Sequence, residues 1–158
     1  MENGLSPSSE LAAQAVEVCL CFHTRKASRA ITQVFDHILA PTGLKATQLS
    51  LLMVVSAREP LRIGDLADAL VSDSTTVSRT IKPLIKAGLI QDSTDSQDRR
   101  IKRISLSSSG HAALERALPL WQDAQSHIAK QLGGSTVQTL LPALESAAKL
   151  GSTDERKL

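Results

Sequence analysis

Aromatic residues are nearly absent from this chain of 158 residues: they make up 2%, with one tryptophan, two phenylalanines and no tyrosine. A core with so few rings must be filled by Leu, Ile, Val and Ala, and this favours helices. The scarcity also argues against proteins that stack RNA or single strands on aromatic platforms. No run of about 18 apolar residues is present, so no membrane span is expected. Residues 1–10 lack a basic cluster ahead of an apolar run, so no secretory signal is expected.

Cysteine is also scarce. The two cysteines, Cys19 and Cys21, are too few for a disulfide framework and predict a cytoplasmic protein with free thiols. The histidines have no Cys, Asp or His partner at zinc-finger spacing, so neither a metal site nor a cofactor is expected: they are His23, His37, His111 and His127. With 42% hydrophobic and 22% charged residues, the composition is that of one ordinary globular domain.

The small net charge of +2 hides an uneven distribution. Residues 74–103 contain seven of the 18 basic residues and three of the 16 acidic ones, so this window carries +4 and the rest of the chain −2. Such a concentration of positive charge is typical of a nucleic-acid surface. From charge alone, a solvated basic face is an equally good interpretation.

Apolar spacing and breakers predict a mainly helical chain with one small hairpin. Residues 11–40 contain neither Pro nor Gly and predict one long helix. Thr47 is the expected N-cap of the next helix, Asp73 or Ser74 that of the fourth, and Gly88 the residue that ends the fourth. Pro119 falls inside the fifth helix, where it can bend it. The expected helices are 11–40, 47–57, 64–70, 74–87, 107–132 and one that begins at Ser135 or Thr136. A short extended segment is expected at 61–63, and the strands of the hairpin are expected at 89–91 and 101–106.

The helix expected over residues 74–87 has two contrasting faces. Its apolar residues predict a buried face formed by Val77, Ile81, Leu84 and Ile85. An exposed stripe opposite carries Thr75, Arg79, Lys82 and Lys86, with Thr76 and Ser78 beside it near the start. Short hydroxyls at the N-terminus followed by long cations suit the major groove of DNA. Taken alone, a polar stripe on an amphipathic helix is also typical of plain surface.

The polar loop 92–100 strengthens the DNA interpretation. It ends in adjacent arginines, Arg99 and Arg100, at the expected hairpin tip, and arginine is well suited to a narrow minor groove. Asp98 can pair with an arginine and fix its direction; the alternative is a surface ion pair of about 0–1 kcal/mol. Twelve residues after a polar helix, the loop favours DNA binding.

The order and spacing of these motifs resemble the MarR family of bacterial transcription regulators over roughly residues 15–150. The resemblance implies a mainly α fold with a small β-hairpin wing: a winged helix-turn-helix plus a helical dimerisation domain. The motifs are Thr47-Gln48-Leu49-Ser50-Leu51-Leu52, Ile63-Gly-Asp-Leu-Ala, Thr76-Val77-Ser78-Arg79, Gly88-Leu89-Ile90, Asp98-Arg99-Arg100 and Leu106-Ser-Ser-Ser-Gly110.

The family's usual mode implies a homodimer that represses transcription at a pseudo-palindrome and is released by a ligand or by oxidation. By position, Lys82 would hold phosphate, and Arg100 would enter the minor groove with Asp98 orienting it and Arg99 beside it. The residues that would lie in the major groove are Ser74, Thr75, Thr76, Ser78 and Arg79.

The apolar faces of the terminal helices give an independent argument for dimerisation, because one chain buries too little of them and a two-fold partner would cover them. The expected division is a flexible N-terminus (1–10), a helical dimerisation region (11–44 and 107–150), a winged helix-turn-helix DNA-binding domain (45–106) and a flexible C-terminus (151–158).

Cys21 is the candidate redox sensor, because Leu20-Cys21-Phe22 followed by Ala27-Ser28 resembles the organic-hydroperoxide-sensing branch of the family. Arg25, four residues on, would favour the thiolate. That branch has tyrosines around its cysteine and this chain has none, so a small buried hydrophobe is the alternative. Within one helix, Cys19 lies about 200° from Cys21, which disfavours a disulfide between them. A disulfide between subunits stays open.

The family's usual effector pocket lies between the dimerisation helices and the DNA-binding module. Its candidate lining residues are His23, Arg25, Arg29 and Trp121, whose cations would suit an anionic aromatic ligand; a surface or dimer contact is the alternative for each.

Two other functions are alternatives to DNA binding. An enzyme is disfavoured, because the sequence has no Gly-rich phosphate loop, no Gly-x-Ser-x-Gly elbow and no paired carboxylates on one face. A helical partner-binding module that has kept the winged fold without binding DNA would be expected to lose the cations of the helix and the wing. Both sets are present, so DNA binding is favoured.

Overall fold

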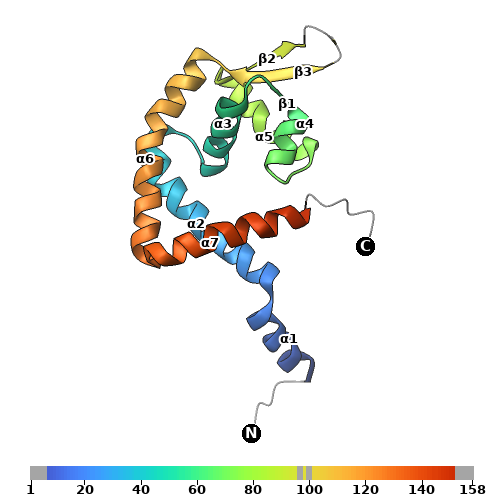
Figure 1. Ribbon diagram of the computed structural model, residues 1–158, viewed down its shortest axis with the longest axis vertical. Coiled ribbons are helices and arrows are strands. Elements are labelled where there is room, and N and C mark those ends of the chain that lie inside the picture. The colour runs from blue at the N-terminus through green and yellow to red at the C-terminus, as the bar shows by residue number, and fades with distance from the viewer. Residues whose placement is uncertain (1–6, 96–97, 99–100, 152–158) are drawn as a thin grey trace.

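The computed structural model describes residues 7–95, 98 and 101–151, arranged as a winged-helix module at one end of an elongated helical frame (Figure 1). Helix α6 runs down one side of the molecule, α7 turns back from its end, and α1 projects away from the body. The helices are α1 (Pro7–Val18), α2 (Leu20–Leu39), α3 (Ala46–Arg58), α4 (Ile63–Ala69), α5 (Ser74–Lys86), α6 (Ser108–Leu132) and α7 (Gly134–Ala148), with 3-10 turns η1 (Ala40–Thr42) and η2 (Lys149–Gly151).

The winged-helix module combines α3, α4 and α5 with a three-stranded antiparallel sheet of order β1-β3-β2. The strands are β1 (Leu61–Arg62), β2 (Ile90–Thr94) and β3 (Lys102–Leu106). Ile90 pairs with Leu106 at the base of the hairpin, and Thr94 pairs with Lys102 near its tip. Strand β2 extends three residues beyond the predicted one, because its outer residues are polar and exposed and carry no apolar alternation.

The hydrophobic core lies almost entirely inside this module. Helix α3 is central to it, as its apolar middle predicts, with four side chains at most 2% exposed: Leu49, Leu51, Leu52 and Val55. The remaining core residues are Leu39, Leu44, Leu61, Leu66, Ala67, Val77, Ile81, Leu84, Ile90, Ile104, Leu106, Leu114 and Ala117. Burial of each large apolar side chain contributes about 1.5–3 kcal/mol before the cost of ordering the chain, so this cluster is the main stabilising feature of the module.

The start of α3 differs from its prediction. The helix begins at Ala46 and its N-cap is Lys45, so the expected cap at Thr47 is wrong. Ala46 N donates to Asp36 Oδ1 of α2 at 2.7 Å, and Lys45 N donates to the side chain of Gln48, in the first turn of α3, at 2.9 Å. A carboxylate from α2 therefore satisfies the first N–H group of α3, where the winged-helix module begins.

The long helix predicted over residues 11–40 is divided in two. Cys19 has extended backbone angles (φ −73°, ψ 105°) and is the N-cap of α2, with its Sγ accepting a hydrogen bond from Phe22 N at 3.4 Å. Helix α1 also begins at Pro7, four residues before the expected start. No proline or glycine marks the break, and the capping sulfur supplies its local reason.

Helices α6 and α7 match their predictions closely. Ser107 is the N-cap of α6, which runs without interruption past Pro119, and Gly133 separates it from α7. Helix α7 has no buried residue, and Leu141 and Leu144 are 59% and 43% exposed. At the end of η2, Gly151 lies beside Val71, in the turn between α4 and α5. Within the described residues, no single helix is both long and apolar enough to cross a membrane.

Candidate nucleic-acid interface

Helix α5 presents the two faces predicted for it, with one exception. Val77, Ile81 and Leu84 are each 2% exposed and anchor the helix on the core, whereas Ile85 is 36% exposed. The prediction that Ile85 is buried is wrong, because it lies at the edge of the apolar stripe near the end of the helix. The opposite stripe is exposed along its whole length: Thr75, Arg79, Lys82 and Lys86. These four side chains have no hydrogen-bond or ion-pair partner within the described part of the chain.

The N-terminus of α5 is fixed by Asp73, which confirms one of the two predicted caps. Asp73 Oδ1 accepts a hydrogen bond from Thr76 N at 2.8 Å, and Oδ2 accepts one from Thr76 Oγ1 at 2.6 Å. The hydrogen bond from the Thr76 hydroxyl has the larger effect and that from the Thr76 N–H the smaller, and both lower the pKa of Asp73 below its usual range. Because the Thr76 hydroxyl donates its hydrogen to Asp73, its oxygen is left to act as an acceptor.

The other short side chains at this end divide into two groups. Ser78 is half-buried and its hydroxyl donates to the carbonyl of Ser74 at 2.6 Å. Ser74 and Thr75 are exposed in the first turn, where the backbone N–H groups of a helix favour phosphate or other anions. Of the predicted hydroxyl contacts, those of Thr76 and Ser78 therefore already donate their hydrogens within the chain.

The C-terminal end of α5 turns directly into the wing. Gly88 has a φ of 72°, in the left-handed region that favours glycine, and its N–H donates to Ile85 O at 2.9 Å. Leu89 N donates to Leu84 O at 2.9 Å. The glycine predicted to end this helix is therefore confirmed, and it reverses the chain into β2.

The start of α6 is joined to this turn. Ser107 Oγ accepts from Gly110 N at 3.0 Å and donates to Gly88 O, while Ser107 N donates to Leu89 O at 3.0 Å. A Cβ on Gly110 would stand 2.0 Å from Leu89 O, so only glycine allows this approach. The Leu106-Ser-Ser-Ser-Gly110 motif thus closes a joint between α5, the wing and α6.

Glu59 reinforces the joint from the end of α3. Its Oε2 accepts from Leu106 N at 2.6 Å, and its Oε1 lies 3.1 Å from His111 Nε2 in α6. One carboxylate therefore connects the last residue of β3 to the first turns of α6. The sequence did not single out Glu59, because its partners lie about fifty residues further along the chain.

The wing is held by acid–base pairs across the hairpin. Lys102 Nζ lies 3.1 Å from Asp92 Oδ2, and this hydrogen bond, followed by the lysine's charge, lowers the pKa of Asp92. Arg103 forms an ion pair with Asp95, whose side chain is 10% exposed, and its Nη1 donates to Pro60 O at 3.3 Å. The wing is thereby tied to the segment before β1.

Asp95 also organises the wing loop. Its Oδ1 accepts from Asp98 N at 3.2 Å, Asp95 N donates to Ile101 O, and Ile101 N donates to Asp98 O, each of the latter at 2.9 Å. Sequence reasoning missed Asp95 and Arg103; their opposite charges at facing ends of a predicted hairpin were the available signal. Asp98 is half-buried. Arg99 and Arg100, the predicted minor-groove residues, lie outside the described residues.

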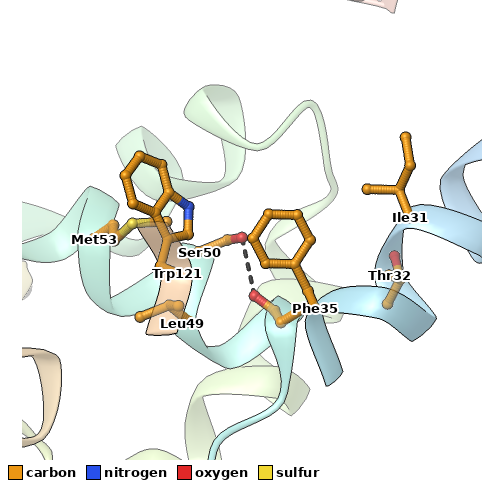
Figure 2. Close-up of a pocket in the computed structure, with 8 residues that line it drawn as sticks. Ile31, Thr32, Phe35, Leu49, Ser50, Met53 and Trp121 are labelled. Carbon is orange, nitrogen blue, oxygen red and sulfur yellow. Dashed lines mark hydrogen bonds between the residues drawn. The ribbon is translucent and has the colours of Figure 1, made fainter. Parts of the chain in front are cut away.

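The predicted effector residues do not share one cavity. Trp121 lines a cavity of about 200 Å³ between α2, α3 and α6, together with apolar side chains such as Phe35 and Met53 and the hydroxyl residues Thr32 and Ser50 (Figure 2). Arg25 and Arg29 line a separate groove of about 430 Å³ along α2. Ile31 of the cavity lies about 200° around the helix from Arg29, so the cavity and the groove occupy different faces.

His23 belongs to the junction between α1 and α2. Its Nε2 lies 3.0 Å from Glu17 O, and its ring meets that of Phe22 edge-on at 5.5 Å. Cys21 is exposed in the chain and Cys19 is half-buried, so the alternative that Cys21 is buried is wrong for the single chain. The expectation that both cysteines share one helix also fails, because Cys19 precedes α2.

The module's fold and the exposed face of α5 define a winged helix-turn-helix protein. Residues 44–102 match the model of the MarR family. The structure is similar to the Mycobacterium tuberculosis transcriptional regulator MosR in complex with DNA, with a TM-score of 0.73, 34% identity and coverage of 84% of this chain and 97% of MosR. The chain belongs to the MarR family of transcriptional regulators, which confirms the predicted family, fold class and lack of enzymatic function.

Curated relatives agree with this assignment over part of their length. An uncharacterised HTH-type transcriptional regulator of Bacillus cereus is 34% identical over 87 residues, covering 55% of this chain and 57% of the relative. The organic hydroperoxide resistance transcriptional regulator of Bacillus subtilis is 27% identical over 101 residues, covering 64% of this chain and 69% of that protein. Both matches are to regulators.

Proposed function

We propose that the protein is a homodimeric transcriptional repressor that binds pseudo-palindromic double-stranded DNA through two winged-helix modules. The observation that carries this proposal is the exposed stripe of α5, whose cations have no partner within the described residues and stand opposite a buried face. A rigid helix with an unneutralised stripe beside a hairpin fits the major groove with a wing on the flanking backbone. The likeness to a regulator in complex with DNA supports it.

The contacts divide by groove. Ser74, Thr75, Thr76, Ser78 and Arg79 read or approach the major groove, with the Thr76 oxygen as an acceptor. Lys82 holds phosphate, since long cations further along a helix reach the backbone. In the wing, Arg100 enters the minor groove, Asp98 orients it and Arg99 lies beside it.

Residues 45–106 form the DNA-binding domain, and residues 11–44 and 107–150 form the dimerisation region. Support comes from the exposed apolar residues of the terminal helices, which include Leu11 at 67%, Leu141 at 59% and Leu132 at 44%. An isologous two-fold interface would cover both sets of helices in both subunits. The site of action is the cytoplasm, where bacterial DNA lies.

Oxidation of Cys21 or binding of a small molecule releases the DNA. Exposure of the Cys21 thiol favours oxidation, because an organic hydroperoxide can reach it. The peroxide then oxidises the thiol to a sulfenic acid and is itself reduced to the alcohol. For a small effector, the cavity beside Trp121 is the better candidate site, since it lies between α2, α3 and α6. A ligand bound there can change the position of the winged-helix module relative to α2 and α6.

The first experiment measures binding of the reduced protein to DNA from around its own gene by fluorescence anisotropy, at several salt concentrations. Arg79→Ala is expected to weaken binding roughly tenfold or more. Arg116→Ala, which removes an exposed cation from α6, is the matched control and should bind as the parent does. A folded dimer that binds no fragment would instead favour a partner-binding module.

The second experiment adds an organic hydroperoxide and then dithiothreitol. We expect the peroxide to prevent DNA binding and dithiothreitol to restore it. The Cys21→Ser variant should keep binding DNA in the presence of the peroxide. Binding that is indifferent to peroxide rules out oxidation and leaves the cavity beside Trp121 as the effector site.

A further inference from the structure

Helix α1 and the first half of α2 lack cover from their own chain. Every residue of Ser8–Val18 and of Leu20–Ala30 is exposed, and α1 makes no extensive contact with another described element. A helix of 12 residues is marginal in water without packing. Its stripe Leu11, Ala15 and Val18 is apolar, and Val18 is 83% exposed. This segment needs a surface to bind.

The charges on the two helices are opposite. Helix α1 contains Glu10 and Glu17 and no Lys or Arg. These carboxylates are seven residues apart, so they form one row beside the apolar stripe. The groove on α2 contains three cations and no acid: it is lined by Phe22, Arg25, Lys26, Arg29, Ala30 and Gln33.

The dimensions of the two surfaces also agree. The groove runs from Phe22 to Gln33, about 18 Å of helix, and α1 is about 18 Å long. Phe22 is 43% exposed and, with Ala30, gives the groove an apolar floor between its cations. An apolar stripe flanked by carboxylates is complementary to an apolar floor flanked by cations.

A chain does not place its own α1 in its own groove. A single residue, Cys19, connects the helices, and the junction is held by His23 N to Cys19 O at 3.1 Å and by His23 Nε2 with Glu17 O at 3.0 Å. Helix α1 accordingly continues away from the body, beyond the start of α2 (Figure 1). A second copy of the chain offers the same groove without reversing this junction.

We propose that α1 of each subunit is an arm that docks into the α2 groove of its partner, with Glu10 and Glu17 facing Arg25, Lys26 and Arg29. The two-fold axis repeats the contact, so each dimer contains two arm–groove pairs. The inference rests on the homodimer proposed above and assigns two of its contact surfaces. It also gives the cations of the groove a protein partner.

The test uses full-length chains with reversed charges. The arm variant carries Glu10→Lys and Glu17→Lys, and the groove variant carries Arg25→Glu and Arg29→Glu. In each homodimer both pairs become repulsive, so the dimer dissociation constant at low salt should rise roughly tenfold or more in analytical ultracentrifugation. Asp68→Lys, an exposed charge on α4, is the control and should leave it unchanged.

Mixing the two variants is the decisive step. In the heterodimer, the basic arm meets the acidic groove and the acidic arm meets the basic groove, so dimerisation should return. Recovery also proves that both variants fold. A mixture that stays monomeric while a chain with all four substitutions dimerises would overturn the proposal, because the arm would then cover its own groove.

Two further outcomes separate this inference from the proposed dimer. If both variants dimerise as tightly as the parent, the arm–groove contact is wrong and the homodimer stands. If the parent is monomeric at every concentration, the homodimer itself fails, and the arm–groove contact fails with it.

Discussion

The winged-helix module and the terminal helices differ sharply in how much they bury. Residues 44–106 contribute nearly the whole core, with Leu52 and Leu66 fully buried, whereas α1 and α7 have no buried side chain among their described residues. The module therefore holds the core of the chain, whereas the terminal helices leave much of their apolar surface exposed in the single chain. In the proposed dimer, a second copy of the chain would cover the apolar faces that the terminal helices leave exposed.

Replacing one leucine in each region tests whether the module and the terminal helices differ in their contribution to folding stability. Leu52→Ala is expected to lower the free energy of unfolding by about 3 kcal/mol, from lost burial and a cavity. Leu141→Ala, 59% exposed on α7, should leave folding nearly unchanged and weaken the dimer. Urea unfolding at two protein concentrations measures both effects; equal losses from the two substitutions would contradict the division.

A pair of glycines sharpens the comparison at the joint. Gly110→Ala places a methyl group against Leu89 O and should cost about 2 kcal/mol of stability, with looser coupling between wing and α6. Gly134→Ala is the control, because nothing lies within 4 Å of the added Cβ at the start of α7. Thermal unfolding checks the difference, and an equally stable Gly110→Ala variant would show that the joint is not close-packed.

Asp95→Asn tests whether the wing is a separate contributor to binding. Removing the charge that holds Arg103 and the loop backbone should weaken DNA affinity several-fold, while α5 keeps its geometry. Lys82→Ala should instead reduce the slope of log K against log salt by about 1. If Asp95→Asn binds DNA like the parent, the loop needs no fixed orientation.

The smallest expected effect concerns the cap of α5. The pKa of Asp73 is lower in the folded chain than in the unfolded one, so its contribution to stability is present at neutral pH. That contribution is lost as pH falls below the ordinary aspartate pKa, about 3.9, and through the lower folded value. The difference in melting temperature between the parent and Asp73→Ala should therefore shrink in acid. A difference that grows in acid would reverse the assigned sign.

The module was predictable from the sequence because its signals are local. The apolar run at residues 49–55, the cap at Asp73 and the turn at Gly88 each act within one or two turns of chain. The exposure of Arg79 and Lys82 follows from the same helical spacing. This is why the prediction of a buried and an exposed face for α5 was correct except at Ile85, which lies at the edge between the two faces.

The features that sequence analysis missed depend on partners far along the chain or lie in helices that the single chain leaves exposed. Asp36 caps a helix ten residues later, and Glu59 bonds to Leu106, so no local pattern marks either. The break at Cys19 lies in a segment with no buried neighbour to dictate its course. His23, Arg25 and Trp121 were predicted to line one pocket but lie at three different sites. The prediction failed because sequence spacing does not show which face of α2 the module covers.

The joint around Gly110 makes α6 a lever. The helix has 25 residues, about 37 Å, and its first turns are bonded to the end of α5 and to the base of the wing. A tilt of roughly 5° about its far end would carry the module about 3 Å. In the proposed dimer, two such modules would have to match half-sites about 34 Å apart. A small rotation of α6 would therefore be enough to move both α5 helices out of register with their half-sites on the DNA.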